Sequence, residues 1–200
     1  MSKKFVLRKL LGNRSFLDYK PEVFWRERSD GRGEENAPWL PDFVKFLKEN
    51  KCKSVLEIGC GSGVNLGYAK RVLKNLSCTG FDLSEKHIET GRAKYPEIEL
   101  FCADLRNQDF GSHDCILTSG VLMHVLPRDI NKTIEKIKTS SKKAIFCYEF
   151  RKKDLGSRHP NNFVFNYDYQ KLFSSLEKKF FKEYGSDYSA FGFTKQALRP

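Results

Sequence analysis

The sequence predicts an α/β fold in which helices cover both faces of a mostly parallel sheet. Short apolar segments alternate with amphipathic segments along most of the 200 residues, which is typical of parallel strands joined by helical crossovers. The apolar segment 55–58 also runs into a turn with glycine at every second position, Gly59, Gly61 and Gly63, and an amphipathic stretch follows from residue 66. A strand, a glycine-rich turn and a helix in this order present backbone N–H groups to a nucleoside-bearing ligand.

Each further element has its own start or stop signal. Pro41 opens the first helix of the alternating region. Ser84 caps a later helix, which Pro96 stops, and Asp129 begins the next one. The segment 144–150 is apolar nearly throughout, as a central parallel strand is. In chain order we predict helices at residues 41–51, 66–74, 84–95, 129–139 and 168–176. We predict strands at residues 54–58, 77–81, 98–102, 114–118, 144–150, 179–184 and 188–193.

The N-terminal residues differ from this alternating region. Residues 3–11 carry apolar side chains at helical spacing between basic ones, which predicts a short basic amphipathic helix. Residues 12–37 are polar, with scattered aromatic residues and no clear period. We therefore divide the chain into an N-terminal helical or lid segment, residues 1–37, and one α/β domain, residues 38–200.

Composition indicates a soluble globular protein. Hydrophobic residues make up 40% of the chain and charged residues 30%, and no apolar run approaches the roughly 20 residues of a membrane span. The apolar stretch near the N-terminus is too short and too charged for a secretory signal. The six cysteines show no Cys-x-x-Cys pair, and five lie in or beside predicted strands, so we expect buried, reduced thiols in a reducing cytoplasm.

The net charge of +11 is unevenly distributed. Residues 1–54 carry +5, residues 55–138 are neutral, and residues 139–200 carry +6. An anionic partner would explain the excess: a nucleic acid, a phosphorylated or acidic sugar, or a membrane surface. A basic surface that serves solubility explains it equally well.

The glycine turn distinguishes between two classes of nucleoside ligand. A dinucleotide fingerprint requires its third glycine at position 64, but Val64 stands there. With Glu57 before the glycines, the pattern is Glu-x-Gly-x-Gly-x-Gly, which resembles motif I of the class I S-adenosylmethionine (SAM) dependent methyltransferases. The resemblance covers roughly residues 40–195. It implies a three-layer, Rossmann-like sandwich whose seven-stranded, mostly parallel sheet has an antiparallel last strand. It also implies SAM as cofactor, with a nicotinamide enzyme as the alternative.

The same resemblance assigns cofactor contacts at the ends of the predicted strands. Glu57 orients the glycine loop or meets the amino group of the methionine moiety. Asp82 accepts hydrogen bonds from both ribose hydroxyls, although a surface or helix-capping aspartate would look the same. Asp104 accepts the adenine amino hydrogen. Trp25 covers the site unless it is a core residue. The full set of expected cofactor residues is Trp25, Arg26, Glu57, Gly59, Cys60, Gly61, Gly63, Asp82, Leu83, Asp104, Leu105 and Ser119, and Arg28 is the alternative to Arg26 as partner of the SAM carboxylate.

Two residues are candidates for catalysis. Residues 118–125 resemble the Gly-Val-Leu-x-His stretch of many small-molecule methyltransferases, and His124 has an unperturbed pKa of about 6.5 that suits a general base. A structural histidine at the start of a helix is the alternative. Glu149 ends the strand 144–150, where a carboxylate would take a proton or bind a hydroxyl group, unless it pairs with Arg151 or Lys152.

The polar, aromatic-containing loop 156–169 is expected to shape the acceptor site, with His159 and Tyr167 as substrate-binding residues. The sequence contains neither an Asn-Pro-Pro-Tyr nor a Pro-Cys motif of nucleobase methylation. We therefore predict methyl transfer to an oxygen or nitrogen of a small polar acceptor, a saccharide or another metabolite. The alternatives are an RNA- or protein-directed methyltransferase and a non-catalytic SAM-binding protein. No histidine or cysteine spacing predicts a metal site.

Overall fold

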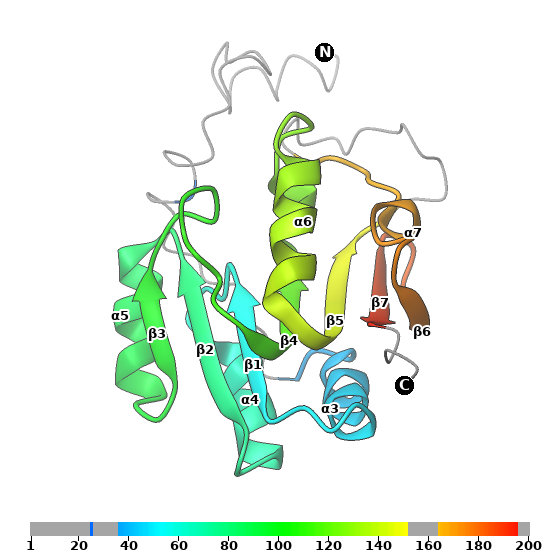
Figure 1. Cartoon of the computed structure of the whole chain (residues 1–200). Helices are drawn as coiled ribbons and strands as arrows, with labels where there is room; N and C mark the ends of the chain where they lie inside the picture. The colour runs from blue at the N-terminus through cyan, green and yellow to red at the C-terminus, as the bar shows by residue number, and fades with distance from the viewer. Residues whose placement is uncertain (1–24, 26–35, 152–163, 196–200) are drawn as a thin grey trace, which may run out of the picture.

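A seven-stranded sheet in the order β3-β2-β1-β4-β5-β7-β6 organises the fold (Figure 1). The computed structural model describes residue 25 and residues 36–151 and 164–195. All neighbouring strands pair in parallel except β7, which is antiparallel to both β5 and β6. The strands are β1 (Ser54–Ile58), β2 (Ser77–Asp82), β3 (Glu99–Cys102), β4 (His113–Ser119), β5 (Ser141–Phe150), β6 (Glu177–Tyr184) and β7 (Tyr188–Thr194).

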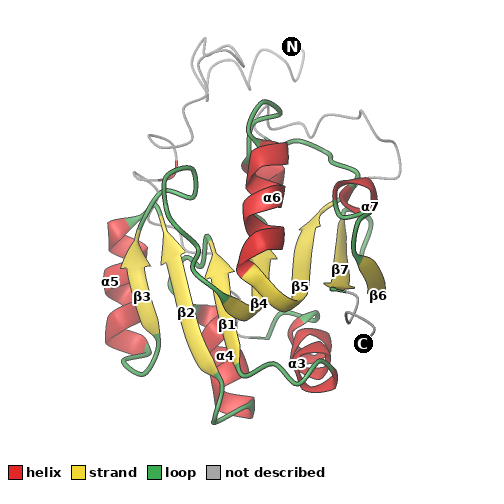
Figure 2. Ribbon diagram, in the orientation of Figure 1, coloured by secondary structure: helices red, strands yellow, loops and turns green. Residues whose placement is uncertain are grey.

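Helices cover both faces of this sheet, with α6 on the near face and α4 on the far face in Figure 2. Residues of α3 (Leu40–Glu49), α4 (Val64–Val72) and α5 (Glu85–Lys94) share one core cluster with the sheet. Residues of α6 (Ile130–Ser140) and the short α7 (Tyr169–Leu172) share the other. The predicted three-layer sandwich, with its mostly parallel sheet and one antiparallel strand near the end of the chain, is confirmed.

Aromatic side chains pack together in one part of the first core cluster. The ring of Phe146 on β5 contacts the rings of Phe43 and Phe46 on α3, at centroid distances of 5.2 and 5.3 Å. It also contacts Trp39 and, on β6, Phe180. Because successive strand residues point to opposite faces, the neighbouring Cys147 belongs to the other cluster. Strand β5 therefore joins the two cores, which explains why it is apolar nearly throughout.

Several element boundaries differ from the predicted ones. The predicted helix 168–176 is reduced to the four residues of α7. Asp168 caps it by accepting a hydrogen bond from the backbone N–H of Lys171, but the chain turns again at once, and Leu176 N–H donates to Phe173 O. Strand β5 begins three residues before its predicted start because Ser141 pairs with His113 of β4.

The cysteine prediction is correct for four of the five strand-associated residues. Cys60, Cys78, Cys115 and Cys147 are buried, and all six thiols are free. Cys102 is exposed, so the prediction is wrong there. This residue ends β3, which is an edge strand, and an edge position leaves a side chain with fewer neighbours to cover it.

The N-terminal predictions fall largely outside the described residues. These include the helix 3–11, Arg26 and Arg28, and His159 of the acceptor loop also lies there. The division at residue 37 therefore stays a prediction. Within the described residues, no helix has both the length and the apolar character needed to cross a membrane.

Removing the ring of Phe146 should destabilise the fold strongly. This side chain is fully buried, so we expect Phe146→Ala to lower the free energy of unfolding by about 3–5 kcal/mol in urea titrations. Phe181→Ala on β6 is the matched control, because that ring is 39% exposed and should cost about 1 kcal/mol or less. Equal losses in the two variants would contradict the packing described for β5.

Candidate cofactor and active site

The predicted site lies where the sheet order reverses. Strand β1 pairs with β2 on one side and β4 on the other, so the loops that follow β1 and β4 diverge at the carboxyl edge of the sheet. In Figure 1 the arrowheads of β1, β2 and β3 point to this same edge. Ligands of open α/β sheets bind at such a switch point.

Two glycines of the β1–α4 turn have different physical tasks. Gly59 has φ +66°, and a Cβ there would overlap Cγ2 of Val121 in the loop after β4. Gly61 has φ +54°, but no atom lies within 4 Å of where its Cβ would be. Gly59 therefore permits the close packing of two loops, whereas Gly61 faces open space. An absent side chain in open space leaves the backbone accessible to a ligand.

Glu57 ends up fully buried beside this turn. Its Oε1 accepts a hydrogen bond of 2.6 Å from Asn65 Nδ2 in the first turn of α4. Its Oε2 is buried without a hydrogen-bond partner among the described residues. Burial raises the pKa of Glu57 to about 8. An unpartnered buried carboxylate oxygen next to an open backbone cradle is suited to a ligand's N–H donor.

Asp82 is tied to the same turn. Its Oδ2 accepts from Gly61 N–H and its Oδ1 from Ser84 N–H, both at 2.9 Å. Ser84 itself caps α5, as predicted, because its hydroxyl accepts from His87 N–H. Each carboxylate oxygen can accept a second hydrogen bond, so Asp82 is held in place and still able to bind hydroxyl groups.

Asp104 follows β3 and is held by a residue that the sequence analysis missed. The guanidinium of Arg106 contacts both carboxylate oxygens, and Arg106 N–H donates to Oδ1 at 2.9 Å. An adenine amino group would share this carboxylate with Arg106. Because Asp-x-Arg is a common local ion pair, no signal in the sequence distinguished it from an ordinary loop.

Lys136 on α6 holds the same loop from the other side. Its ammonium group donates to the carbonyl oxygens of Leu105 and Gln108, at 2.9 and 2.6 Å, and lies over the ring of Phe110. Burial lowers its pKa. This lysine was also missed, because it looks like any other polar residue on an amphipathic helix. It fixes the backbone next to the predicted adenine contact.

Glu149 lies near the end of β5, as predicted, and faces the loop that follows β4. It is fully buried, and its carboxylate accepts from three successive backbone N–H groups, those of Val121, Leu122 and Met123, at 3.2–3.3 Å. These residues lead into the 3-10 turn η2 (Leu122–His124). Burial raises the pKa of Glu149 to about 7. The carboxylate therefore caps the turn that carries His124. Within the described residues the alternative ion pair with Arg151 is not formed, and Lys152 lies outside them.

The structure brings Trp25 and His124 together. Their ring centroids lie 4.6 Å apart in an edge-to-face arrangement. Tyr167 lies nearby, since its hydroxyl donates to Val125 O at 2.6 Å. Phe165 N–H donates to Met123 O at 2.7 Å, so the end of the predicted acceptor loop is anchored to the segment around His124.

The remaining predicted cofactor residues flank these groups. Gly63 is the N-cap of α4, and Cys60 is buried in the turn. Leu83 and Leu105 are half-buried and follow the two aspartates, and half-buried Ser119 ends β4.

A model of a methyltransferase domain family matches residues 55–144. Over these 90 residues the chain is similar to a methyltransferase domain. This match supports the resemblance drawn from Glu57 and the glycines. The matched region contains the β1–α4 turn and the ends of β2, β3 and β4, where the predicted cofactor residues from Glu57 to Ser119 lie.

The curated relatives match only part of the chain. A putative methyltransferase, 235L, of Invertebrate iridescent virus 6 is 28% identical over 91 residues, which are 46% of this chain and 33% of the viral protein. The chain spans a third or less of the curated relatives that it matches.

Solved structures of methyltransferases share the fold. Magnesium protoporphyrin IX methyltransferase from Synechocystis PCC 6803, with bound SAH, has a TM-score of 0.67 at 15% identity, over 97% of this chain and all of that one. Human N-acetylserotonin methyltransferase in complex with SAM has a TM-score of 0.63 at 17% identity, over 80% of this chain and 52% of that one. At these identities the likeness establishes the fold alone.

Replacing Glu149 by glutamine should destabilise the fold. The amide nitrogen of Gln would face a backbone donor, so Glu149→Gln should lower the free energy of unfolding by about 1–3 kcal/mol. The folded-state pKa of about 7 lies above the ordinary value of 4.5, so proton binding stabilises the fold at low pH. The wild type should therefore lose stability as pH rises from 4.5 to 7, by at most about 1.4 kcal/mol per pH unit.

Urea titrations at pH 5, 6 and 7 measure both effects. The Glu149→Gln variant should lack this share of the pH dependence, while Glu183→Gln, at an exposed position of β6, should match the wild type at every pH. An unchanged pH profile in Glu149→Gln would show that the buried carboxylate does not bind the proton.

Proposed function

We propose that the protein transfers a methyl group from SAM to an oxygen or nitrogen of a small polar acceptor. The observation that supports this most directly is the site at the switch point. There, the open backbone of Gly61 lies beside the unpartnered Oε2 of Glu57 and the anchored carboxylate of Asp82. These groups match the amino acid and ribose parts of the cofactor in chemical character, and Asp104 extends the same edge of the sheet.

Each residue has a definite task in this proposal. Glu57 Oε2 accepts from the amino group of the methionine moiety, and Asp82 accepts from the ribose hydroxyls. Asp104 accepts from the adenine amino group, while Lys136 fixes the loop next to it. The bound cofactor supplies an electrophilic methyl group on its sulfonium, so the protein needs to align the acceptor, exclude water and remove at most one proton.

His124 is the proposed general base. It lies on the turn that follows β4, at the same edge of the sheet, and the ring of Trp25 contacts it. Trp25 belongs to the N-terminal segment proposed as a lid, so this contact would close the site over the histidine. Glu149 is a positioning residue, because it holds the backbone of residues 121–123 rather than reaching a reacting atom.

The class of acceptor follows from the loops around His124. Residues 118–125 resemble the corresponding stretch of small-molecule methyltransferases, and Tyr167 lies beside them. A saccharide or another hydroxyl-bearing metabolite suits these polar and aromatic side chains. An RNA- or protein-directed enzyme is the second candidate, favoured by the net charge of +11.

Calorimetric titration of the full chain with S-adenosylhomocysteine tests the cofactor site. Asp82→Asn removes a charge-assisted acceptor and should weaken binding about 10–100-fold. Glu85→Gln, which neutralises an exposed carboxylate three residues later, should bind like the wild type. If Asp82→Asn also bound like the wild type, the proposed ribose contact would be excluded.

The acceptor is then sought with labelled methyl groups. We expect transfer from SAM to the small-molecule fraction of a cell extract. Label in the RNA or protein fraction would favour the second candidate, and SAM binding without any transfer would identify a non-catalytic binding protein.

Glu57 should make cofactor binding depend on pH. Its pKa of about 8 means that the carboxyl is largely protonated near neutrality, and a ligand ammonium beside it favours the ionised form. Binding of S-adenosylhomocysteine at pH 7 should therefore release a fraction of a proton, and affinity should increase from pH 6 to pH 7.5. Calorimetry in buffers of different ionisation enthalpy measures the protons released. Glu57→Gln should abolish this release, and an equal release in that variant would refute the contact.

A further inference from the structure

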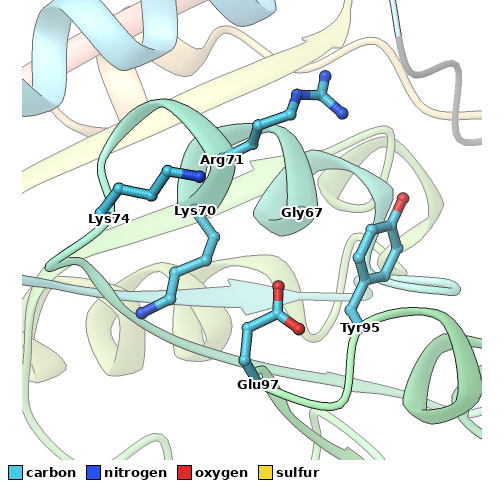
Figure 3. A pocket seen from close by; sticks show the side chains of 6 residues that line it. All are labelled: Gly67, Lys70, Arg71, Lys74, Tyr95 and Glu97. Atoms are coloured by element: carbon cyan, nitrogen blue, oxygen red, sulfur yellow. The ribbon is translucent and has the colours of Figure 1, made fainter.

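A cavity of about 370 Å³ lies at the opposite end of α4 from the glycine turn (Figure 3). It is formed between the second half of α4 and the loop that joins α5 to β3. Its walls are Gly67, Lys70, Arg71, Lys74, Tyr95 and Glu97. None of these residues belongs to the cofactor site, and the volume is within the range of small-molecule pockets.

The shape of this cavity depends on a close contact between α4 and Tyr95. Gly67 has no side chain, and a Cβ at that position would overlap the ring of Tyr95. The ring therefore packs directly on the helix backbone and forms one wall. Figure 3 shows Tyr95 at one side of the cavity and Glu97 below α4, with its carboxylate directed toward the helix.

The residues that line this space carry charges of both signs. Lys70, Arg71 and Lys74 contribute three positive charges from one end of α4, and Glu97 contributes one negative charge. Lys70 Nζ donates to Leu76 O at 2.7 Å. The guanidinium of Arg71 also lies over the ring of Tyr68, 5.3 Å from its centroid. Within the described residues, Arg71, Lys74 and Glu97 form no salt bridge.

The helix dipole alone does not account for this arrangement. Cations are favourable near any helix C-terminus, and α3 likewise carries Lys48 in its last turn. The dipole does not explain why a carboxylate, that of Glu97, lines the same space as these three cations. A ligand with both an anionic group and a hydrogen-bond donor would satisfy the two sides at once.

We propose that this cavity binds the phosphate and ribose of a nucleotide. Arg71 and Lys74 bind the phosphate, with the guanidinium as a two-point donor and the charge of Lys70 in support. Glu97 accepts a hydrogen bond from a ribose hydroxyl. Inorganic phosphate offers this carboxylate no donor of equal strength at neutral pH. The base lies beside the ring of Tyr95, which packs on Gly67 and is also contacted by the ammonium group of Lys94. This site is separate from the proposed methyl transfer and does not depend on it.

Uridine 5′-monophosphate (UMP) is the probe, because it lacks the adenine of the cofactor. The full chain, with saturating S-adenosylhomocysteine, should bind UMP with a dissociation constant of about 1 mM or tighter by calorimetry. The double variant Arg71→Gln/Lys74→Gln should weaken this binding at least tenfold. It leaves Lys70 in place near the helix C-terminus, and a circular dichroism spectrum checks that it folds.

The double variant Lys45→Gln/Lys48→Gln on α3 is the matched control. It removes the same charge from exposed helical positions and should bind UMP like the wild type. Asp82→Asn should also bind UMP normally, which separates this cavity from the cofactor site. Equal weakening in the α3 control, or no UMP binding by the wild type, would overturn the proposal.

Glu97→Ala tests the ribose contact by effects of opposite sign. Removing the carboxylate should strengthen the binding of inorganic phosphate, because a repulsive charge is lost, and should weaken the binding of UMP. Stronger binding of both ligands would refute the contact with Glu97. A ten-residue oligouridylate then distinguishes the source: binding at least tenfold tighter than UMP indicates nucleotides within RNA, and equal binding indicates the free nucleotide.

Discussion

Two carboxylates at strand ends, those of Asp82 and Glu149, bind backbone N–H groups of neighbouring loops and thereby determine the geometry of the site. Asp82 binds the backbone of Gly61 and of Ser84, and Glu149 binds three consecutive backbone N–H groups after β4. Burying a carboxylate is costly unless such donors surround it. The loops must therefore adopt conformations that direct their N–H groups to the strand ends, and the site inherits its shape from that requirement.

The unsatisfied groups are as informative as the satisfied ones. Glu57 has one oxygen bound to Asn65 and one without a partner, and this asymmetry lies next to the backbone cradle of Gly61. At the other end of α4, Glu97 and Arg71 line one cavity, and within the described residues they form no salt bridge with each other. In both places the fold leaves polar groups next to open space. A ligand that enters this space can form hydrogen bonds with them.

Most helices and strands could be predicted from the sequence. The signals that predict them, the spacing of apolar residues and the capping residues of helices, involve only a few neighbouring residues. The strand Ser54–Ile58 and the Ser84 cap agree with their predictions. The placement of Asp82 and Asp104 at one edge of the sheet was also predictable, since the carboxyl ends of parallel strands share that edge. Lys136 was not, because its role depends on carbonyl groups in a loop about 30 residues earlier, which no local pattern reports.

By itself, the sequence determined the order of strands and helices, the glycine turn and the family resemblance, since these depend on side-chain pattern and spacing. Only the tertiary structure decided which polar side chains are already bound to the protein. Glu149 illustrates this division: its place at a strand end is visible in the sequence, but the three amides that occupy it come from another strand's loop. Long-range pairing of this kind follows from packing in three dimensions, whereas the residue pattern records only neighbours along the chain.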